Sequence, residues 1–120
     1  MRRERGAAAV EFALILPVLV ILVFGIVEFG RAYNATVTLT HAVREGVREL
    51  AISGDAGEAM AATHGAAIGL DDTLLDVATT PCDPGHPTSV TASYPFRYHV
   101  PLFGAATVTL HAEAVMRCGG

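Results

Sequence analysis

The sequence predicts an α+β fold: a long N-terminal helix, half in a membrane and half outside it, a short second helix, and a small antiparallel sheet. Three observations predict it. An apolar run lies near the N-terminus, an amphipathic helical pattern follows it directly, and the second half of the chain alternates apolar and polar residues in segments rich in Val and Thr. The length of 120 residues allows one domain at most.

The apolar run covers residues 7–27 and contains one charged residue, Glu11. A helix needs about 20 apolar residues to cross the hydrocarbon core of a bilayer, so the run predicts one transmembrane helix in contact with membrane lipid. Basic residues precede the run, namely Arg2, Arg3 and Arg5, and few follow it, which places the N-terminus in the cytoplasm and the bulk of the chain outside. The mean hydropathy of +0.45 agrees with a membrane segment.

Proline and aromatic residues add detail to this helix. Pro17 leaves the carbonyl of Ala13 without its helical hydrogen bond, so we expect a kink there, which packing alone would explain. Phe24, Phe29 and Tyr33 are expected near the outer boundary, because aromatic rings prefer the headgroup layer.

A cleavable secretory signal is the main alternative to a permanent membrane helix. The basic start and the run of residues 13–27 fit such a signal, and Gly30 and Ala32 satisfy the rule for a cut after Ala32. Two charged residues, Glu28 and Arg31, lie where a neutral stretch is usual, and the helical pattern continues through the cut. Both observations favour the membrane helix.

The helical pattern continues beyond the membrane as an apolar stripe. Leu39, Val43, Val47 and Leu50 follow one another at steps of four, four and three. One helix is therefore expected over about residues 7–51, with its outer half covering the sheet.

The rest of the chain predicts a second helix and three or four strands. The segment SGDAG, residues 53–57, ends the long helix, and a shorter Ala-rich helix is expected at roughly residues 57–68. Strands are expected at LLDVATT (74–80), TSVTASYPF (88–96) and ATVTLHAEAVMRC (106–118), and turns at PCDPGHP (81–87) and YPFRYHVPLFG (94–104).

The two cysteines favour a disulfide. Cys82 lies in the loop before the second strand and Cys118 at the end of the last one, and an even count in an exported domain predicts pairing. The alternative is two unpaired thiols.

Motifs for catalysis, cofactors or nucleic acids are not found. The five histidines are scattered without metal-ligand spacing, so neither a metal site nor an enzyme is expected. Gly-rich phosphate loops and nucleophile motifs are missing from the sequence, and we expect no cofactor. Net charge is −4, and the first five residues are basic while the remainder of the chain is acidic, which argues against nucleic-acid binding.

The N-terminal segment resembles the processing site of type IV prepilins and pseudopilins. A short basic leader ends at Gly6, and a hydrophobic helix follows whose fifth and sixth residues are Glu11 and Phe12. The resemblance implies cleavage between Gly6 and Ala7, after which Ala7 carries a new ammonium one helical turn from Glu11. A carboxylate in the membrane is costly unless paired, so Glu11, with Phe12, is expected to register subunits. The alternative is a carboxylate that reaches the cytoplasmic interface.

The wider pattern is similar to the TadE-like family of tight-adherence pilus assembly proteins. The segments that carry the resemblance are AAVEFAL with a proline soon after, EFGR, REG, SYPF and VMRCGG. The resemblance implies a pilin-like fold and a minor pilin or pseudopilin, processed by a prepilin peptidase. Pilin subunits of such systems often have Tyr after the Glu, where this chain has Phe12. This departure favours a pseudopilin over a major pilin.

Two function classes are compatible with these features. In the first, the chain is a structural subunit. It has a leader (residues 1–6), a transmembrane helix (7–30) in the inner membrane and an extracytoplasmic domain (31–120). Its partners are other pilin subunits, the prepilin peptidase and the assembly platform. Small residues such as Ala8 and Gly25 would let neighbouring helices approach. In the second, a membrane-anchored or secreted binding domain never polymerises. Whether the first six residues are removed discriminates between the classes.

Overall fold

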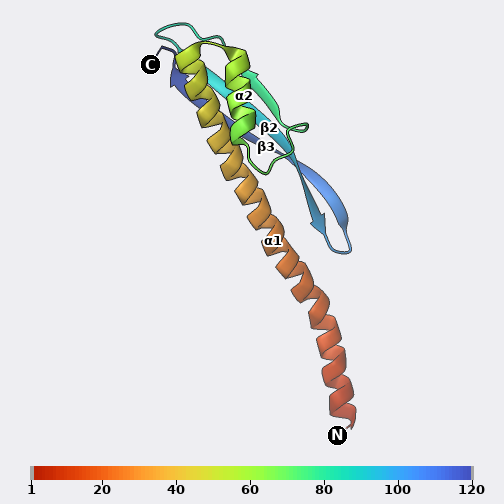
Figure 1. The fold of residues 1–120 in the computed structure, drawn as a ribbon. Coiled ribbons are helices and arrows are strands. Elements are labelled where there is room, and N and C mark those ends of the chain that lie inside the picture. Colours follow the sequence, from red (N-terminus) through yellow and green to blue (C-terminus); the bar gives the residue numbers. More distant parts are fainter. Residues whose placement is uncertain (1, 120) are drawn as a thin grey trace.

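The computed structural model describes residues 2–119, in an elongated shape of 81 × 23 × 17 Å. Helix α1 (Arg2–Ser53) runs along most of this length, and the other elements gather around its C-terminal half (Figure 1). These elements are helix α2 (Ala56–Ala66) and strands β1 (Asp76–Thr79), β2 (Pro87–Val100) and β3 (Gly104–Arg117). The strands form an antiparallel sheet in the order β1-β2-β3, which confirms the predicted α+β fold.

Helix α1 is continuous, as the sequence predicts, and extends a few residues further at both ends than expected. Pro17 lies inside it without interrupting it, and Figure 1 shows the helix axis bending in its N-terminal third. A gentle bend at a proline is expected, because the ring removes one hydrogen bond and crowds the preceding turn.

A glycine ends α1 and an aspartate begins α2, as the segment SGDAG predicts. Gly54 has a φ of 70°, and its N–H donates to the Leu50 carbonyl at 2.9 Å. The Asp55 carboxylate then accepts hydrogen bonds from the N–H groups of Gly57 and Glu58 at 2.8 and 3.2 Å. These bonds satisfy donors at the start of α2 that have no partner within the helix.

The core lies between the outer half of α1 and one face of the sheet. Leu39, Val43, Val47 and Leu50, the predicted apolar stripe, are all buried. They pack in one cluster with buried side chains of α2, β1 and β2, among them Ala59, Val77, Val90 and Ala92. The expectation that the amphipathic half of the helix covers the sheet is confirmed.

The two helices approach closely at Gly46. A Cβ atom at this position would overlap Thr63 Oγ1 of α2 and lie 3.2 Å from Thr63 Cβ and 3.3 Å from the Ala59 carbonyl oxygen. Thr63 is fully buried, and its hydroxyl donates to that same carbonyl at 2.8 Å. Only glycine fits here, so Gly46 sets the distance between α1 and α2.

The predicted turn over residues 94–104 is wrong, because β2 continues through it as far as Val100. The turn between β2 and β3 contains only residues 101–103. Pro95 was expected to break the strand. Ser89 and His99, six residues before and four residues after it, direct their backbone N–H groups away from β3, toward Thr80 and Glu28. Along the strand Pro95 shares this orientation, and the pairing of β2 with β1 stops at Ser93, opposite Asp76. A proline there loses no hydrogen bond of the sheet, so the strand tolerates it.

Candidate membrane and assembly site

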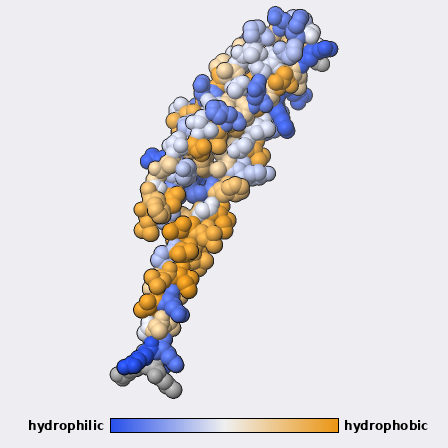
Figure 2. Space-filling model, turned by 180° about the vertical axis from the view of Figure 1, so that it is seen from behind, coloured by the Kyte–Doolittle hydropathy of each residue, from blue (hydrophilic) through white to orange (hydrophobic). Residues whose placement is uncertain are grey.

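The N-terminal half of α1 has an apolar surface that no other described element covers. Every Leu, Val and Phe between Val10 and Val27 leaves at least 40% of its surface exposed. Figure 2 shows this surface as a band along the narrow part of the molecule, with hydrophilic residues at its N-terminal end. Within residues 3–53, the helix is long and apolar enough to cross a membrane. Exposed apolar area of this extent requires lipid or protein around it.

The predicted processing and registration residues all lie on this uncovered part of α1. Gly6 is exposed, and a Cβ atom there would meet nothing within 4 Å. Ala7 and Glu11 are four positions apart in one helix, so they share a face. Phe12 is 64% exposed and Glu11 is also exposed. The chain includes residues 1–6, so the Ala7 nitrogen is an amide here rather than an ammonium.

The β2–β3 hairpin contacts α1 at the end of the apolar run. The Glu28 carboxylate accepts from Arg31 Nη1 at 2.7 Å with one oxygen and from the His99 backbone N–H at 3.0 Å with the other. Its side chain is only 14% exposed. The Arg31 guanidinium lies 5.2 Å from the centre of the Phe96 ring, within the range of a cation–π contact.

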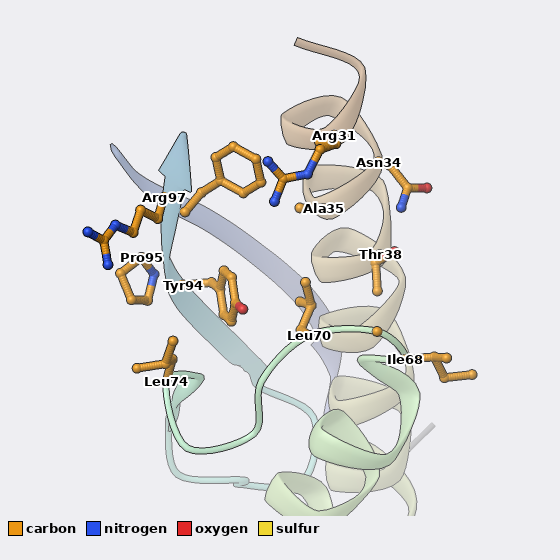
Figure 3. A pocket seen from close by; sticks show the side chains of 12 residues that line it. Arg31, Asn34, Ala35, Thr38, Ile68, Leu70, Leu74, Tyr94, Pro95 and Arg97 are labelled. Carbon is orange, nitrogen blue, oxygen red and sulfur yellow. The ribbon is translucent and has the colours of Figure 1, made fainter. Parts of the chain in front are cut away.

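A half-open hollow of about 290 Å³ lies beside this contact. It is bounded by α1, by the loop that follows α2 and by β2, and Figure 3 shows Tyr94 beside β2 and Leu70 between Tyr94 and α1. The Tyr94 hydroxyl accepts from the Asp71 N–H at 3.2 Å, which ties the loop to the strand. The walls combine polar and apolar side chains, with Arg31 near one end and Arg97 turned outward (Figure 3).

Titratable side chains do not converge on a catalytic or metal-binding arrangement within residues 2–119. No group of three or more His, Cys, Asp or Glu residues in this range is placed to hold a metal ion. His64 Nδ1 of α2 and Asp72 Oδ1 of the loop that follows lie 3.4 Å apart, near the upper limit for a hydrogen bond.

Comparison with protein families gives a match to the family described as TadE-like protein, over residues 6–48. This segment is TadE-like. The match confirms the resemblance over these residues and associates the segment with tight-adherence pili, whereas the segments SYPF and VMRCGG lie outside it. Comparisons with curated proteins and with solved structures gave no match.

The TadE-like segment includes the residues that the sequence singled out at the N-terminus and also two motifs whose roles the structure reveals. Glu28 and Arg31, from EFGR, hold the hairpin against α1, and Gly46, from REG, lets α2 approach. The partners His99 and Phe96 lie outside the segment and were not predicted from the sequence. Their contacts depend on how far the hairpin extends, which no local pattern indicates.

The predicted disulfide between Cys82 and Cys118 is present, at the end of the sheet opposite the turn between β2 and β3. The two Cα atoms are 5.4 Å apart, and Cys118 is buried. The next residue, Gly119, donates its N–H to the Ala51 carbonyl at 2.9 Å. The end of β3 is thereby fastened both to the loop before β2 and to the last turns of α1.

Proposed function

We propose that the protein is a minor pilin or pseudopilin of a tight-adherence pilus, anchored by α1 in the cytoplasmic membrane. The observation that carries the proposal is the TadE-like segment, because it joins the leader, Glu11 and the uncovered apolar helix surface in one continuous element. Pilus assembly explains why a helix with an uncovered apolar surface precedes a compact domain.

The proposed orientation places the basic N-terminus in the cytoplasm and the sheet outside. The basic residues ahead of residues 7–27 support this direction. The disulfide supports it as well, since such bonds form and persist in oxidising compartments outside the cytoplasm.

Processing by a prepilin peptidase would cut between Gly6 and Ala7. Cleavage creates an ammonium at Ala7, on the face of α1 that also carries Glu11. In a membrane each of these charges is costly alone, and a neighbouring processed subunit supplies a partner of opposite sign. Glu11 would then set how far one subunit is displaced along the next, with Phe12 packing beside it.

Lateral assembly would bury the apolar surface of α1 against other pilin helices. Helices in lipid associate through close packing, which small residues allow, and Ala8, Ala9, Ala13 and Gly25 are spread along the membrane half. The partners expected from this proposal are other pilin or pseudopilin subunits and the membrane platform that assembles them.

The N-terminus of the mature protein tests the proposal. Intact-mass and N-terminal analysis of protein from native membranes should find Ala7 as the first residue when the peptidase is present. Gly6→Leu should block cleavage, whereas Gly25→Leu should leave it unchanged. A Cβ atom at either glycine meets nothing within 4 Å, so neither substitution disturbs the fold of the single chain.

Two outcomes would contradict the proposal. Recovery of only the full-length chain in cells with an active peptidase would favour the alternative, a membrane-anchored binding domain that does not polymerise. A first residue close after Ala32 would instead indicate a secreted protein without its helix.

A further inference from the structure

The hairpin between β2 and β3 extends past the rest of the sheet and ends beside the membrane half of α1. Its tip, residues 100–104, carries two apolar side chains that contribute little to the core, Leu102 at 86% and Phe103 at 78% exposed. A shallow hollow separates the tip from α1, and Phe24 lines it from the helix side. In Figure 1 the hairpin is the part of the domain that lies furthest toward the N-terminal end of α1.

The depth of the tip along the helix is fixed by contacts. Glu28 accepts the hydrogen bond from the His99 N–H. About one helical turn further from the apolar run, the Arg31 guanidinium lies over the Phe96 ring. The tip therefore reaches Phe24, three residues inside the end of the apolar run at Val27. At 1.5 Å per residue, this is about 5 Å below the end of the run, a depth typical of groups inserted at a membrane interface.

The turn itself carries an unusual residue for its geometry. The Phe103 N–H donates to the Val100 carbonyl at 3.1 Å, with Pro101 first and Leu102 second in the turn, and Leu102 has a φ of 73°. Turns of this type favour Gly or Asn at the second position, because other side chains are strained there. A leucine at this place gains no packing within the chain, since it is almost fully exposed.

We infer that the hairpin tip inserts Leu102 and Phe103 into the outer interface of the same bilayer that α1 crosses. The inference rests on the proposed membrane anchoring of α1. The protein then has two contacts with the membrane, the helix and the tip, and together they fix the depth and the tilt of the sheet above the surface. Arg97, exposed four residues before Pro101, lies at the level where it meets lipid phosphates.

Tryptophan fluorescence tests this inference, because the chain contains no tryptophan. Three single-tryptophan variants of the full chain are reconstituted at low protein-to-lipid ratio in phosphatidylcholine and phosphatidylglycerol vesicles. Phe103→Trp reports on the tip, Leu16→Trp on the middle of α1, and Val115→Trp on the opposite end of the hairpin, where the side chain is 61% exposed. Lipids brominated near the headgroup or deep in the chains serve as quenchers.

For the Phe103→Trp variant we expect an emission maximum at a shorter wavelength than that of the Val115→Trp variant. Bromines near the headgroup should quench this emission more strongly than bromines deep in the chains. Adding Leu102→Asn, which fits the turn but removes the apolar side chain, should weaken the quenching of Trp at position 103. The Leu16→Trp variant should be quenched best by deep bromines. The Val115→Trp variant should be quenched by neither lipid.

The three variants separate failure of the inference from failure of the anchoring. Quenching at position 16 without quenching at position 103 would overturn the tip insertion and leave the membrane helix in place. A blue shift at position 103 without lipid quenching would mean that a protein surface covers the tip, which also overturns the inference. Absence of quenching at position 16 would refute the anchoring itself.

Discussion

Glu28 and His99 are joined across 71 positions of sequence, by a hydrogen bond of 3.0 Å from the His99 backbone N–H to Glu28 Oε2. The bond lies where β2 has passed the end of β1, so the His99 N–H has no strand to donate to on that side. A helix side chain thus takes the place of a missing strand neighbour. The same carboxylate accepts from Arg31, so Glu28 joins the hairpin to α1 directly and also positions the Arg31 guanidinium near the Phe96 ring.

Replacing Glu28 should therefore loosen the hairpin without unfolding the sheet. In Glu28→Ala, the His99 amide loses a charged acceptor, and its hydrogen exchange should become faster by roughly tenfold. Hydrogen–deuterium exchange by mass spectrometry on the full chain in micelles measures this. Glu113→Ala, an exposed acid on β3, is the matched control and should leave the exchange at His99 unchanged. Equal exchange in both variants would show that the bond does not hold the hairpin.

Gly46→Ala should destabilise the domain, because the new methyl group overlaps the buried Thr63. Overpacking of this kind costs about 1–3 kcal/mol. Gly65→Ala on α2 is the control. A Cβ atom there meets nothing within 4 Å, and alanine favours a helix over glycine by about 1 kcal/mol. In chemical unfolding of the protein in micelles, the free energy of unfolding should therefore fall for Gly46→Ala and rise for Gly65→Ala.

Combining Gly46→Ala with Thr63→Ala gives a further check of the same contact. Removal of Thr63 Oγ1 takes away the worst overlap, while Thr63 Cβ at 3.2 Å stays tight, so the stability should return in part. If the double variant were no more stable than Gly46→Ala, the stability loss of Gly46→Ala would not come from the overlap with Thr63.

Loss of the disulfide should lower stability substantially. The bond closes a loop with a sequence separation of 36, which corresponds to roughly 3–4 kcal/mol in the chain-entropy model. Unfolding of the full chain with and without reductant measures the difference. Alkylation of exported protein without reductant should label neither Cys82 nor Cys118, and ready labelling of both would contradict an oxidised, extracytoplasmic domain.

Glu11→Ala separates assembly from anchoring. The variant removes a charge that is costly in lipid, so it should still enter the membrane, and it should still be cleaved after Gly6. Recovery of pilin partners by crosslinking should fall by roughly tenfold or more, because the ammonium of the neighbouring subunit loses its partner. Glu113→Ala, which removes an exposed acid on β3 away from this helix surface, is the control and should leave partner recovery unchanged. Normal partner recovery with Glu11→Ala would favour a carboxylate that only reaches the interface.

The sequence indicates most of the fold because its helical signals are periodic and its caps are local. The stripe from Leu39 to Leu50, Gly54 and Asp55 each predict what the structure contains. The reach of β2 was not predictable in this way. Pro95 breaks a strand only if its nitrogen faces a neighbour, and that depends on where β1 stops, which local sequence does not determine. The contacts of Glu28 follow from the same long-range register.

Between Glu28 and Ala51, α1 is supported at both ends by the rest of the domain, through the hairpin at one end and through the Gly119 N–H at the other. A helix that is attached to the same domain at two points resists bending between them. With the proposed membrane anchoring, we therefore expect the outer half of α1 and the sheet to tilt together about the point where α1 leaves the membrane. A small change of tilt in the membrane half becomes a larger sideways displacement at the disulfide end, the part of the chain furthest from the bilayer.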